Sequence, residues 1–250
     1  MERAIISDIH GNLEALTAVL ADIDSLEITD IVCLGDVVGY GPDPSECLNL
    51  LRKRARFIIL GNHDDLVLRG APDSELAAYA PHAADSIRWT ASLIDWSTLK
   101  DCVLSYIDGD VHYFHASPDN NRDYLDARSA FGREMIAAAF SRMEGQIGCF
   151  GHTHIPAHYW LTKQGFEIDP LPCDLHGLEL AQGTHLLNVG SVGQPQDRDW
   201  RACYVVQEDA LFTYRRVVYD VHTTQQKLLA ITGMRQEHTA HLADRLSQGN

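Results

Sequence analysis

Gly61-Asn62-His63-Asp64 directly follows the apolar run 57–60. Four further short stretches also carry Asp or His, and in chain order they are Asp8-Ile9-His10, Gly35-Asp36, His115 and Gly151-His152-Thr153-His154. Most begin where an apolar run ends in Gly or Asp, so they are expected at strand tips, where ligands gather in open α/β sheets. Their oxygen and imidazole groups suit two adjacent transition-metal ions.

The first third of the chain alternates short apolar runs with helical spacing. Strands are expected at 4–7, 31–34 and 57–60, with helices over 13–26 and 44–51. This β-α-β-α-β rhythm predicts a parallel sheet with right-handed crossovers.

The rest of the chain mixes helices with short strands. The pattern is helical over 73–99 and 128–143, and Asp108-Gly109-Asp110 between two apolar runs predicts a hairpin. Further strands are expected at 147–150, 157–161, 166–168, 185–189, 203–206 and 211–215, with a helix from 220. Without internal repeats or a low-complexity linker, a single domain over 1–250 is expected. The tail from about 232 is polar, and a frayed helix and a partner contact both remain open.

Composition limits the partners and the location. The chain has 35 Asp+Glu against 20 Lys+Arg and a net charge of −15, which argues against binding of duplex nucleic acid. Bound cations could still invert the local potential for an anionic substrate.

No apolar run reaches the ~18 residues that span a bilayer, and the N-terminus leaves no room for a signal peptide, so no membrane contact is expected. The scattered cysteines are typical of reduced thiols in a cytoplasmic protein, and they are Cys33, Cys47, Cys102, Cys149, Cys173 and Cys203.

The spacing within the stretches suggests how ions could be held. Asp8 and His10 are two residues apart on an emerging strand, which would turn both side chains to one side, and His152 and His154 share that relation. Such a pair could hold one ion or flank two. Asp36 is the natural candidate for a carboxylate that bridges two ions.

The order of the stretches resembles the pattern of the calcineurin-like metallophosphoesterase superfamily, D-x-H, G-D, G-N-H-D/E, a lone H and G-H-x-H. The resemblance spans about 5–206 and implies a four-layer α/β/β/α sandwich with two mixed β-sheets. It implies a binuclear centre in which Asp36 bridges the ions. The other ligands would be Asp8, His10 and His154 for the first ion and Asn62, His115 and His152 for the second. Manganese is the expected metal, and iron, zinc, nickel or cobalt would fit the same ligands.

The resemblance also implies the chemistry. A hydroxide that bridges the two ions would attack phosphorus in line, so no phospho-enzyme would form. His63 would contact the phosphate and protonate the leaving alkoxide, and Asp64 would orient its imidazole.

Further stretches resemble the small bacterial and archaeal phosphodiesterases of this group, and they are Ser7–Asn12, Gly35–Pro42 and Asn188–Pro195. Some members hydrolyse phosphodiesters or dinucleoside polyphosphates. The segments 8–13 and 36–43 lack the arginines of protein Ser/Thr phosphatases. A phosphodiesterase or nucleotide phosphoanhydride hydrolase is therefore expected. The alternatives are a phosphomonoesterase or protein phosphatase and, from another class, a catalytically silent scaffold.

Three residues are candidates for contact with a small phosphorylated substrate, such as a nucleotide. Asn12 could donate to a phosphate or merely cap the first helix, and Tyr40 could stack on a base or pack its loop down. Similar proteins often carry Arg at the position of Gln196. Arg198, with Arg201 nearby, could take over phosphate recognition or lie in a solvated surface loop. The oligomeric state is not predicted.

Overall fold

Two mixed sheets form the centre of the molecule. The structure is a computed structural model that describes residues 2–169 and 176–249. The first sheet runs in the order β3-β2-β1-β11-β12-β9, with strands β1 (Glu2–Ile6), β2 (Asp30–Cys33), β3 (Phe57–Ile58), β9 (His176–Glu179), β11 (Ala202–Glu208) and β12 (Leu211–Val217). The second runs in the order β4-β5-β6-β10-β7-β8, with strands β4 (Ser105–Asp108), β5 (Val111–Phe114), β6 (Ile147–Phe150), β7 (Ala157–Thr162), β8 (Gly165–Asp169) and β10 (His185–Asn188).

Each sheet combines parallel and antiparallel pairs. Strands β1, β2 and β3 pair in parallel, as predicted, and so do β5, β6 and β10. The remaining pairs are antiparallel, including the predicted hairpin of β4 and β5. The parallel strands matter for function because the loops that follow them leave from the same edge of each sheet.

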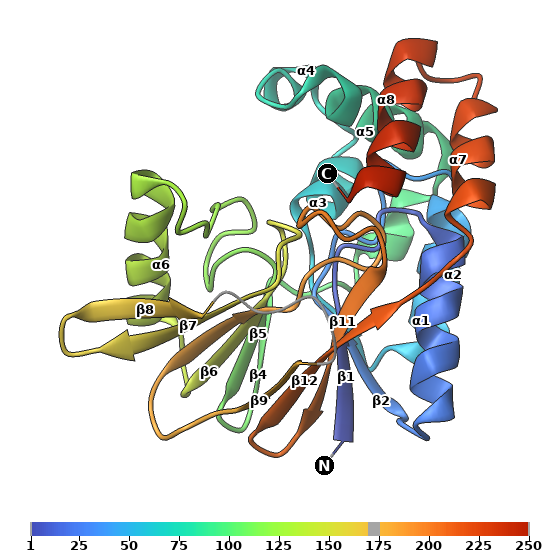
Figure 1. Cartoon of the computed structure of the whole chain (residues 1–250). Helices are drawn as coiled ribbons and strands as arrows, with labels where there is room; N and C mark the ends of the chain where they lie inside the picture. The colour runs from blue at the N-terminus through green and yellow to red at the C-terminus, as the bar shows by residue number, and fades with distance from the viewer. Residues whose placement is uncertain (1, 170–175, 250) are drawn as a thin grey trace.

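Helices cover the outer faces of the two sheets and one end of the sandwich (Figure 1). They are α1 (Leu13–Ser25), α2 (Pro44–Arg54), α3 (Asn62–Leu68), α4 (Asp73–Leu76), α5 (Pro81–Leu93), a 3₁₀ helix (Trp96–Leu99), α6 (Ala130–Arg142), α7 (Val221–Leu229) and α8 (Gln236–Gln248). Figure 1 shows α1 and α2 outside the first sheet and α6 outside the second. The predicted four-layer sandwich is confirmed.

Side chains of β1 show how the layers are held together. Ile5 is buried in the cluster between the two sheets, whereas its neighbours Ala4 and Ile6 are buried in the cluster under the helices. This alternation follows from the two-residue period of a strand, and it explains why a central strand reads as one continuous apolar run.

The helical pattern expected over 73–99 is divided into three short helices. Pro81 is the first residue of α5, and Ala80 before it is extended, because a residue that precedes proline disfavours the helical conformation. Ile94 is also extended and ends α5. The helix α3 was not predicted, and it begins inside the Gly61-Asn62-His63-Asp64 stretch.

The polar tail is a helix packed on the rest of the molecule rather than a frayed end. Helix α8 contacts α7 and α5, and Figure 1 shows these three helices gathered with α4 at one end of the sandwich. The buried side chains of α8 are Thr239, Leu242, Ala243 and Leu246.

The cysteines of the described residues are free thiols, and Cys173 lies outside the described residues. Among the residues that the structure covers, no helix has both the length and the apolarity needed to cross a membrane.

Candidate metal centre

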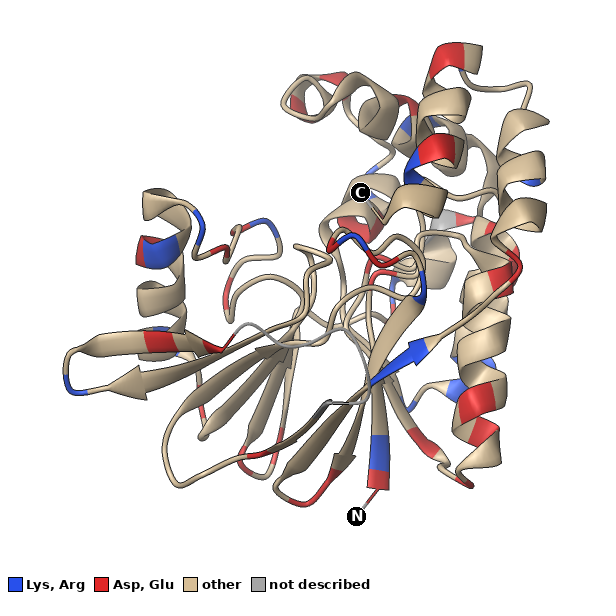
Figure 2. Cartoon of the chain, viewed as in Figure 1, with Lys and Arg blue, Asp and Glu red and all other residues tan. Residues whose placement is uncertain are grey.

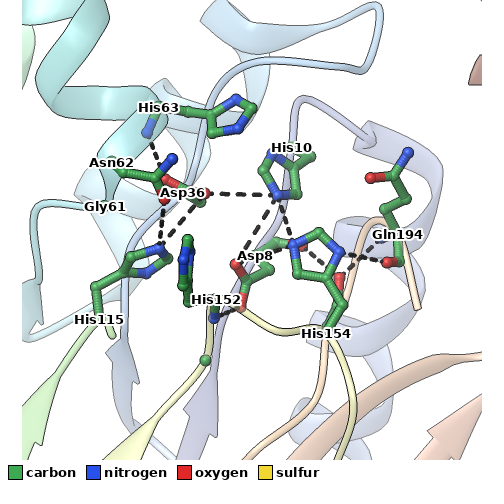
Figure 3. A network of polar contacts seen from close by, with 12 residues as sticks. Asp8, His10, Asp36, Gly61, Asn62, His63, His115, His152, His154 and Gln194 are labelled. Atoms are coloured by element: carbon green, nitrogen blue, oxygen red, sulfur yellow. Dashed lines mark hydrogen bonds and ion pairs between the residues drawn. The ribbon is translucent and has the colours of Figure 1, made fainter. Parts of the chain in front are cut away.

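Loops from both sheets meet at one point, at the carboxyl ends of parallel strands. The loops after β1, β2, β5 and β6 and the first turn of α3 supply the side chains, which Figure 3 shows facing one another. The structure brings together all seven expected ligands, which are Asp8, His10, Asp36, Asn62, His115, His152 and His154. All but the half-buried His152 are buried.

The side chains form two neighbouring groups. The ligand atoms within each group lie within 4.8 Å of one another, and the groups are Asp8, His10 and His154 on one side and Asp36, His115 and His152 on the other. Oδ2 of Asp36 is 3.7 Å from Nε2 of His10 and 3.4 Å from Nε2 of His115. Asp36 thus faces both groups, as a bridging carboxylate must. Oδ1 of Asn62 lies 3.1 Å from Nε2 of His115 and so joins the second group.

Backbone carbonyls hold three of the imidazoles in the same way. Nδ1 of His10 lies 3.2 Å from the Val38 oxygen, and Nδ1 of His115 lies 2.8 Å from the Leu34 oxygen. Nδ1 of His154 lies 2.7 Å from the oxygen of Gln194. A carbonyl only accepts, so each Nδ1 carries a proton and the Nε2 atom of each ring faces the centre. Histidine ligands of metals are oriented in this way.

Two features of the centre call for a cation. Oδ1 of Asp8 is buried and has no hydrogen-bond partner among the described residues. Nε2 of His10 and Nε2 of His154 face each other at 3.0 Å. If both Nδ1 atoms are protonated, these are two lone pairs in contact, an unfavourable arrangement that a metal ion would relieve. The donor set of carboxylate, amide oxygen and imidazole therefore fits divalent transition metals.

Electrostatics keep the carboxylates ionised despite their burial. Burial alone would raise the pKa of Asp36, but the neighbouring His115, His63 and His10 together hold it well below its usual range. Burial likewise opposes ionisation of Asp8, yet His154 nearby lowers the pKa of Asp8 to about 2. Both carboxylates are thus available as anionic ligands at neutral pH.

Burial favours the neutral form of several imidazoles. It lowers the pKa of His10 well below the usual value, and together with the charge of His115 it lowers the pKa of His152 to about 3. At His115 burial also opposes the charged form, but the Asp36 and Asp8 carboxylates outweigh it and raise the pKa to about 9. A metal ion would take the place of that proton, since a ligand imidazole must be neutral.

The ligand-bearing loops hold strained backbone. Left-handed φ values between 49° and 62° occur at Asp8, His10, Asp36, His152 and His154. Non-glycine residues rarely adopt this conformation, and such strain concentrates at functional sites. It also corrects the strand-based argument for Asp8 and His10. Strand β1 ends at Ile6, so Asp8 and His10 lie in the loop after it. The conformation of this loop, rather than the two-residue period of a strand, turns both side chains toward the centre.

The end of β10 and the loop that follows it support these loops. The side-chain amide of Asn188 donates to the Gly151 carbonyl at 2.6 Å and to the Thr153 hydroxyl at 2.9 Å. The hydroxyl of Ser191 donates to the Asp8 carbonyl at 2.8 Å. These bonds hold the loop of His152 and His154 and the loop of Asp8 in place.

His63 lies beside the two groups, and a nitrogen of its ring lies within 4.8 Å of ligand atoms of His10 and Asp36. Its backbone N–H donates to Oδ1 of Asp36 at 2.8 Å, whereas ring Nδ1 is buried without a hydrogen-bond partner in the described chain. A Cβ on Gly39, whose φ is +85°, would lie 2.4 Å from Nδ1 of His63. Glycine at position 39 therefore leaves the space in which the His63 ring packs.

Asp64 does not orient the His63 ring, contrary to what the resemblance implied. Its carboxylate accepts hydrogen bonds from the backbone amides of Val37, Val38 and Gly61 at 3.1–3.2 Å. Burial and the charge of Asp36 raise the pKa of Asp64 to about 7. On the first turn of α3, the side chain of Asp64 points back to the loop of Asp36, so it braces that loop.

The three expected substrate contacts have different outcomes. Asn12 is a cap, because its amide oxygen accepts from the N–H of Ala15 and its NH₂ donates to the Gly193 carbonyl at 2.9 Å. Tyr40 lies on the site, with its ring centroid 4.6 Å from those of His10 and His63. Arg198 is exposed and is not part of the pocket over the centre, so its expected role in phosphate recognition is not supported.

A pocket of about 250 Å³ opens over the metal centre. Besides the metal-centre side chains and Tyr40, its walls include residues that the sequence analysis did not propose as site residues, which are Tyr79, Ala80, His82, Tyr124, Gln196 and Arg245. They come from the segment before α5, from α5 itself, from the loop after β5, from the loop after β10 and from α8. Their sequence positions carry no motif, and only the three-dimensional packing of these segments brings them together.

The fold and the centre together define a metallophosphoesterase. The model of the calcineurin-like phosphoesterase family matches residues 1–156, and this chain belongs to that family. Its members are metal-dependent hydrolases. The resemblance drawn from the sequence is thus confirmed.

Related proteins extend the similarity to the whole chain. The uncharacterized protein MJ0912 of Methanocaldococcus jannaschii is 32% identical over 245 residues, which cover 90% of this chain and 91% of that protein. A metallophosphoesterase from Sphaerobacter thermophilus is 31% identical, with a TM-score of 0.82 and full coverage of both chains. The hypothetical protein PH1004 from Pyrococcus horikoshii shares the fold at 19% identity, with a TM-score of 0.75 over 100% of this chain and 98% of the other.

Proposed function

We propose that this protein is a binuclear metal-dependent phosphoesterase that hydrolyses phosphodiester or nucleotide phosphoanhydride bonds. The observation that carries the proposal is the position of Asp36 between two groups of ligand side chains at the strand ends. Two divalent ions held there would lower the pKa of bound water and withdraw charge from the phosphate oxygens. Manganese is the proposed activating ion, and iron, zinc, nickel or cobalt suit the same donors.

His63 is proposed as the group that donates a proton to the leaving oxygen. It lies on the pocket wall beside Asp36, and its ring nitrogen Nδ1 makes no hydrogen bond with the described protein atoms. Burial lowers the pKa of His63, which favours the neutral ring before substrate arrives. An anionic phosphate in contact with the ring would favour the protonated form, which can then act as an acid.

The pocket walls favour a diester or anhydride over a phosphomonoester. Tyr79 and Tyr124 line the pocket from two different segments, and both offer aromatic surface to a planar group esterified to the phosphate. Arg245 is the one Lys or Arg among the described residues of the lining. A monoester dianion would call for more cationic side chains than the lining supplies.

Partners and location remain proposals as well. In Figure 2 the basic residues of the described chain are interspersed with acidic ones, and the net charge is −15, which supports a small phosphorylated substrate rather than duplex nucleic acid. A cytoplasmic location is proposed because the described cysteines, four of them buried, are free thiols.

The proposal is tested by initial rates on bis-p-nitrophenyl phosphate and p-nitrophenyl phosphate, measured side by side with manganese and with a chelator. We expect faster cleavage of the diester and loss of both rates on chelation. A preference for the monoester would favour the phosphomonoesterase or protein phosphatase alternative. No turnover of either compound by the metal-loaded protein would favour the scaffold alternative.

A further inference from the structure

Helix α8 is fixed against the metal-centre side of the fold by independent contacts. Nδ1 of His238 lies 2.8 Å from a carboxylate oxygen of Asp85 on α5. At the other end, the Gly249 carbonyl accepts from the backbone N–H of Arg198 at 2.8 Å. Between these anchors an apolar face is buried, with Leu242, Ala243 and Leu246. The position of each side chain on α8 is therefore set by packing rather than by a free end.

Arg245 leaves this helix at the edge of its buried face. It is half-buried, next to Leu246, and three residues after Leu242, a spacing that places side chains on neighbouring parts of one helical surface. The side chain reaches the pocket over the metal centre, where Gln196 and His63 are also exposed to the cavity.

The charge of Arg245 is felt across the pocket. Burial is the main influence on the pKa values of Tyr40, His82 and Tyr124, and the positive charge of Arg245 acts on all three by lowering them. These residues come from three different segments of the chain that surround the cavity. The guanidinium thus contributes to the potential that an anion would meet on entering.

The part of the wall formed by Gln196 carries no cation where similar proteins often have Arg. Gln196 lies 3.1 Å from Nδ1 of His154 through its amide nitrogen, and a neutral amide cannot supply the charged, forked donor of arginine. We propose that Arg245 binds a non-bridging phosphate oxygen of the substrate, which makes the C-terminal helix part of the active site. This inference rests on the proposed function and names the residue that recognises the phosphate. Arg245 lies outside the stretch that the family model matches.

The test compares Arg245→Ala, Arg245→Gln and Arg245→Lys with the control Arg235→Ala, which removes the same charge from the exposed start of α8. Each variant is loaded with manganese and checked for metal content and melting temperature. Two quantities are measured, kcat/KM for the faster of the two nitrophenyl substrates and the Kd of inorganic phosphate by calorimetry. We expect Arg245→Ala and Arg245→Gln to lower kcat/KM by about 10- to 100-fold, mainly through KM, and to weaken phosphate binding by a similar factor. Arg245→Lys should recover part of both, and Arg235→Ala should match the wild type.

Three outcomes separate this inference from the proposed function. If a folded, metal-loaded Arg245→Gln protein keeps the wild-type KM and phosphate Kd, the inference is overturned. Turnover by the wild type would still uphold the proposed function in that case. If the wild type turns over neither substrate but binds phosphate, and the Arg245 variants lose that binding, the inference is upheld and the proposed function is not. Absence of both turnover and phosphate binding in the wild type would count against both.

Discussion

Asp36→Asn is expected to lower kcat by about 10³-fold on either nitrophenyl substrate and to reduce the metal bound per chain. The substitution keeps the shape of the side chain but removes the charge that faces His10 and His115 at 3.7 and 3.4 Å. Loss of metal-based charge stabilisation costs several kcal/mol in the transition state, and each 1.36 kcal/mol is tenfold in rate. The rate is measured at saturating substrate, and the metal content by mass spectrometry.

Asp119→Asn provides the control for this prediction. Asp119 is exposed, pairs with Arg142 on the surface and lies in the loop that follows His115. Its replacement removes one carboxylate without changing the centre, so kcat and metal content should stay at wild-type values. Turnover of Asp36→Asn close to that of Asp119→Asn would refute the bridging role of Asp36.

His63→Asn is expected to lower kcat by about 10²–10⁴-fold, the range typical of a lost general acid, with metal content unchanged. Asp36 keeps its hydrogen bond with residue 63 in this variant, because the donor at 2.8 Å is the backbone N–H and not the imidazole. The loss should be larger for cleavage of a methyl phosphate ester bond, which releases methanol, than for cleavage of a nitrophenyl ester bond, which releases nitrophenolate. Nitrophenolate leaves without protonation, whereas an alkoxide needs the proton.

The dependence on the leaving group is the sharpest part of this second prediction. His222→Asn serves as the control because His222 is exposed and its ring lies 2.9 Å from the side-chain nitrogen of Gln226, away from the metal centre. An equal loss for good and poor leaving groups in His63→Asn would show that His63 positions the phosphate and does not protonate the leaving oxygen. A rate near that of His222→Asn would remove His63 from the mechanism.

The centre was predictable from sequence because each ligand follows an apolar run that becomes a strand. Asp36 and His115 come two or fewer residues after the last residues of their runs, and parallel strands deliver such residues to one edge of a sheet. The four layers with two mixed sheets were implied by the family pattern, whereas the order of the strands in each sheet was not predicted. The left-handed backbone at Asp8 and His10 was not predictable, because a strand period explains the same spacing without it.

The pocket walls were not predictable, for a physical reason. Arg245 and Tyr124 lie in segments without a motif, and their positions depend on how α8 and the loop after β5 pack in three dimensions. The role of Asp64 was mistaken for a similar reason. Its place next to His63 in the sequence suggested contact, but successive residues of a helix do not face each other.

The most direct test of the central claim is a manganese titration of the metal-free protein, followed by the initial rate on the faster nitrophenyl substrate and by metal analysis of the same samples. The account predicts that activity is absent without metal and rises until two manganese ions are bound per chain. It also predicts that a chelator abolishes the activity and that added manganese restores it. Full activity after chelation, with no metal retained, would contradict the account.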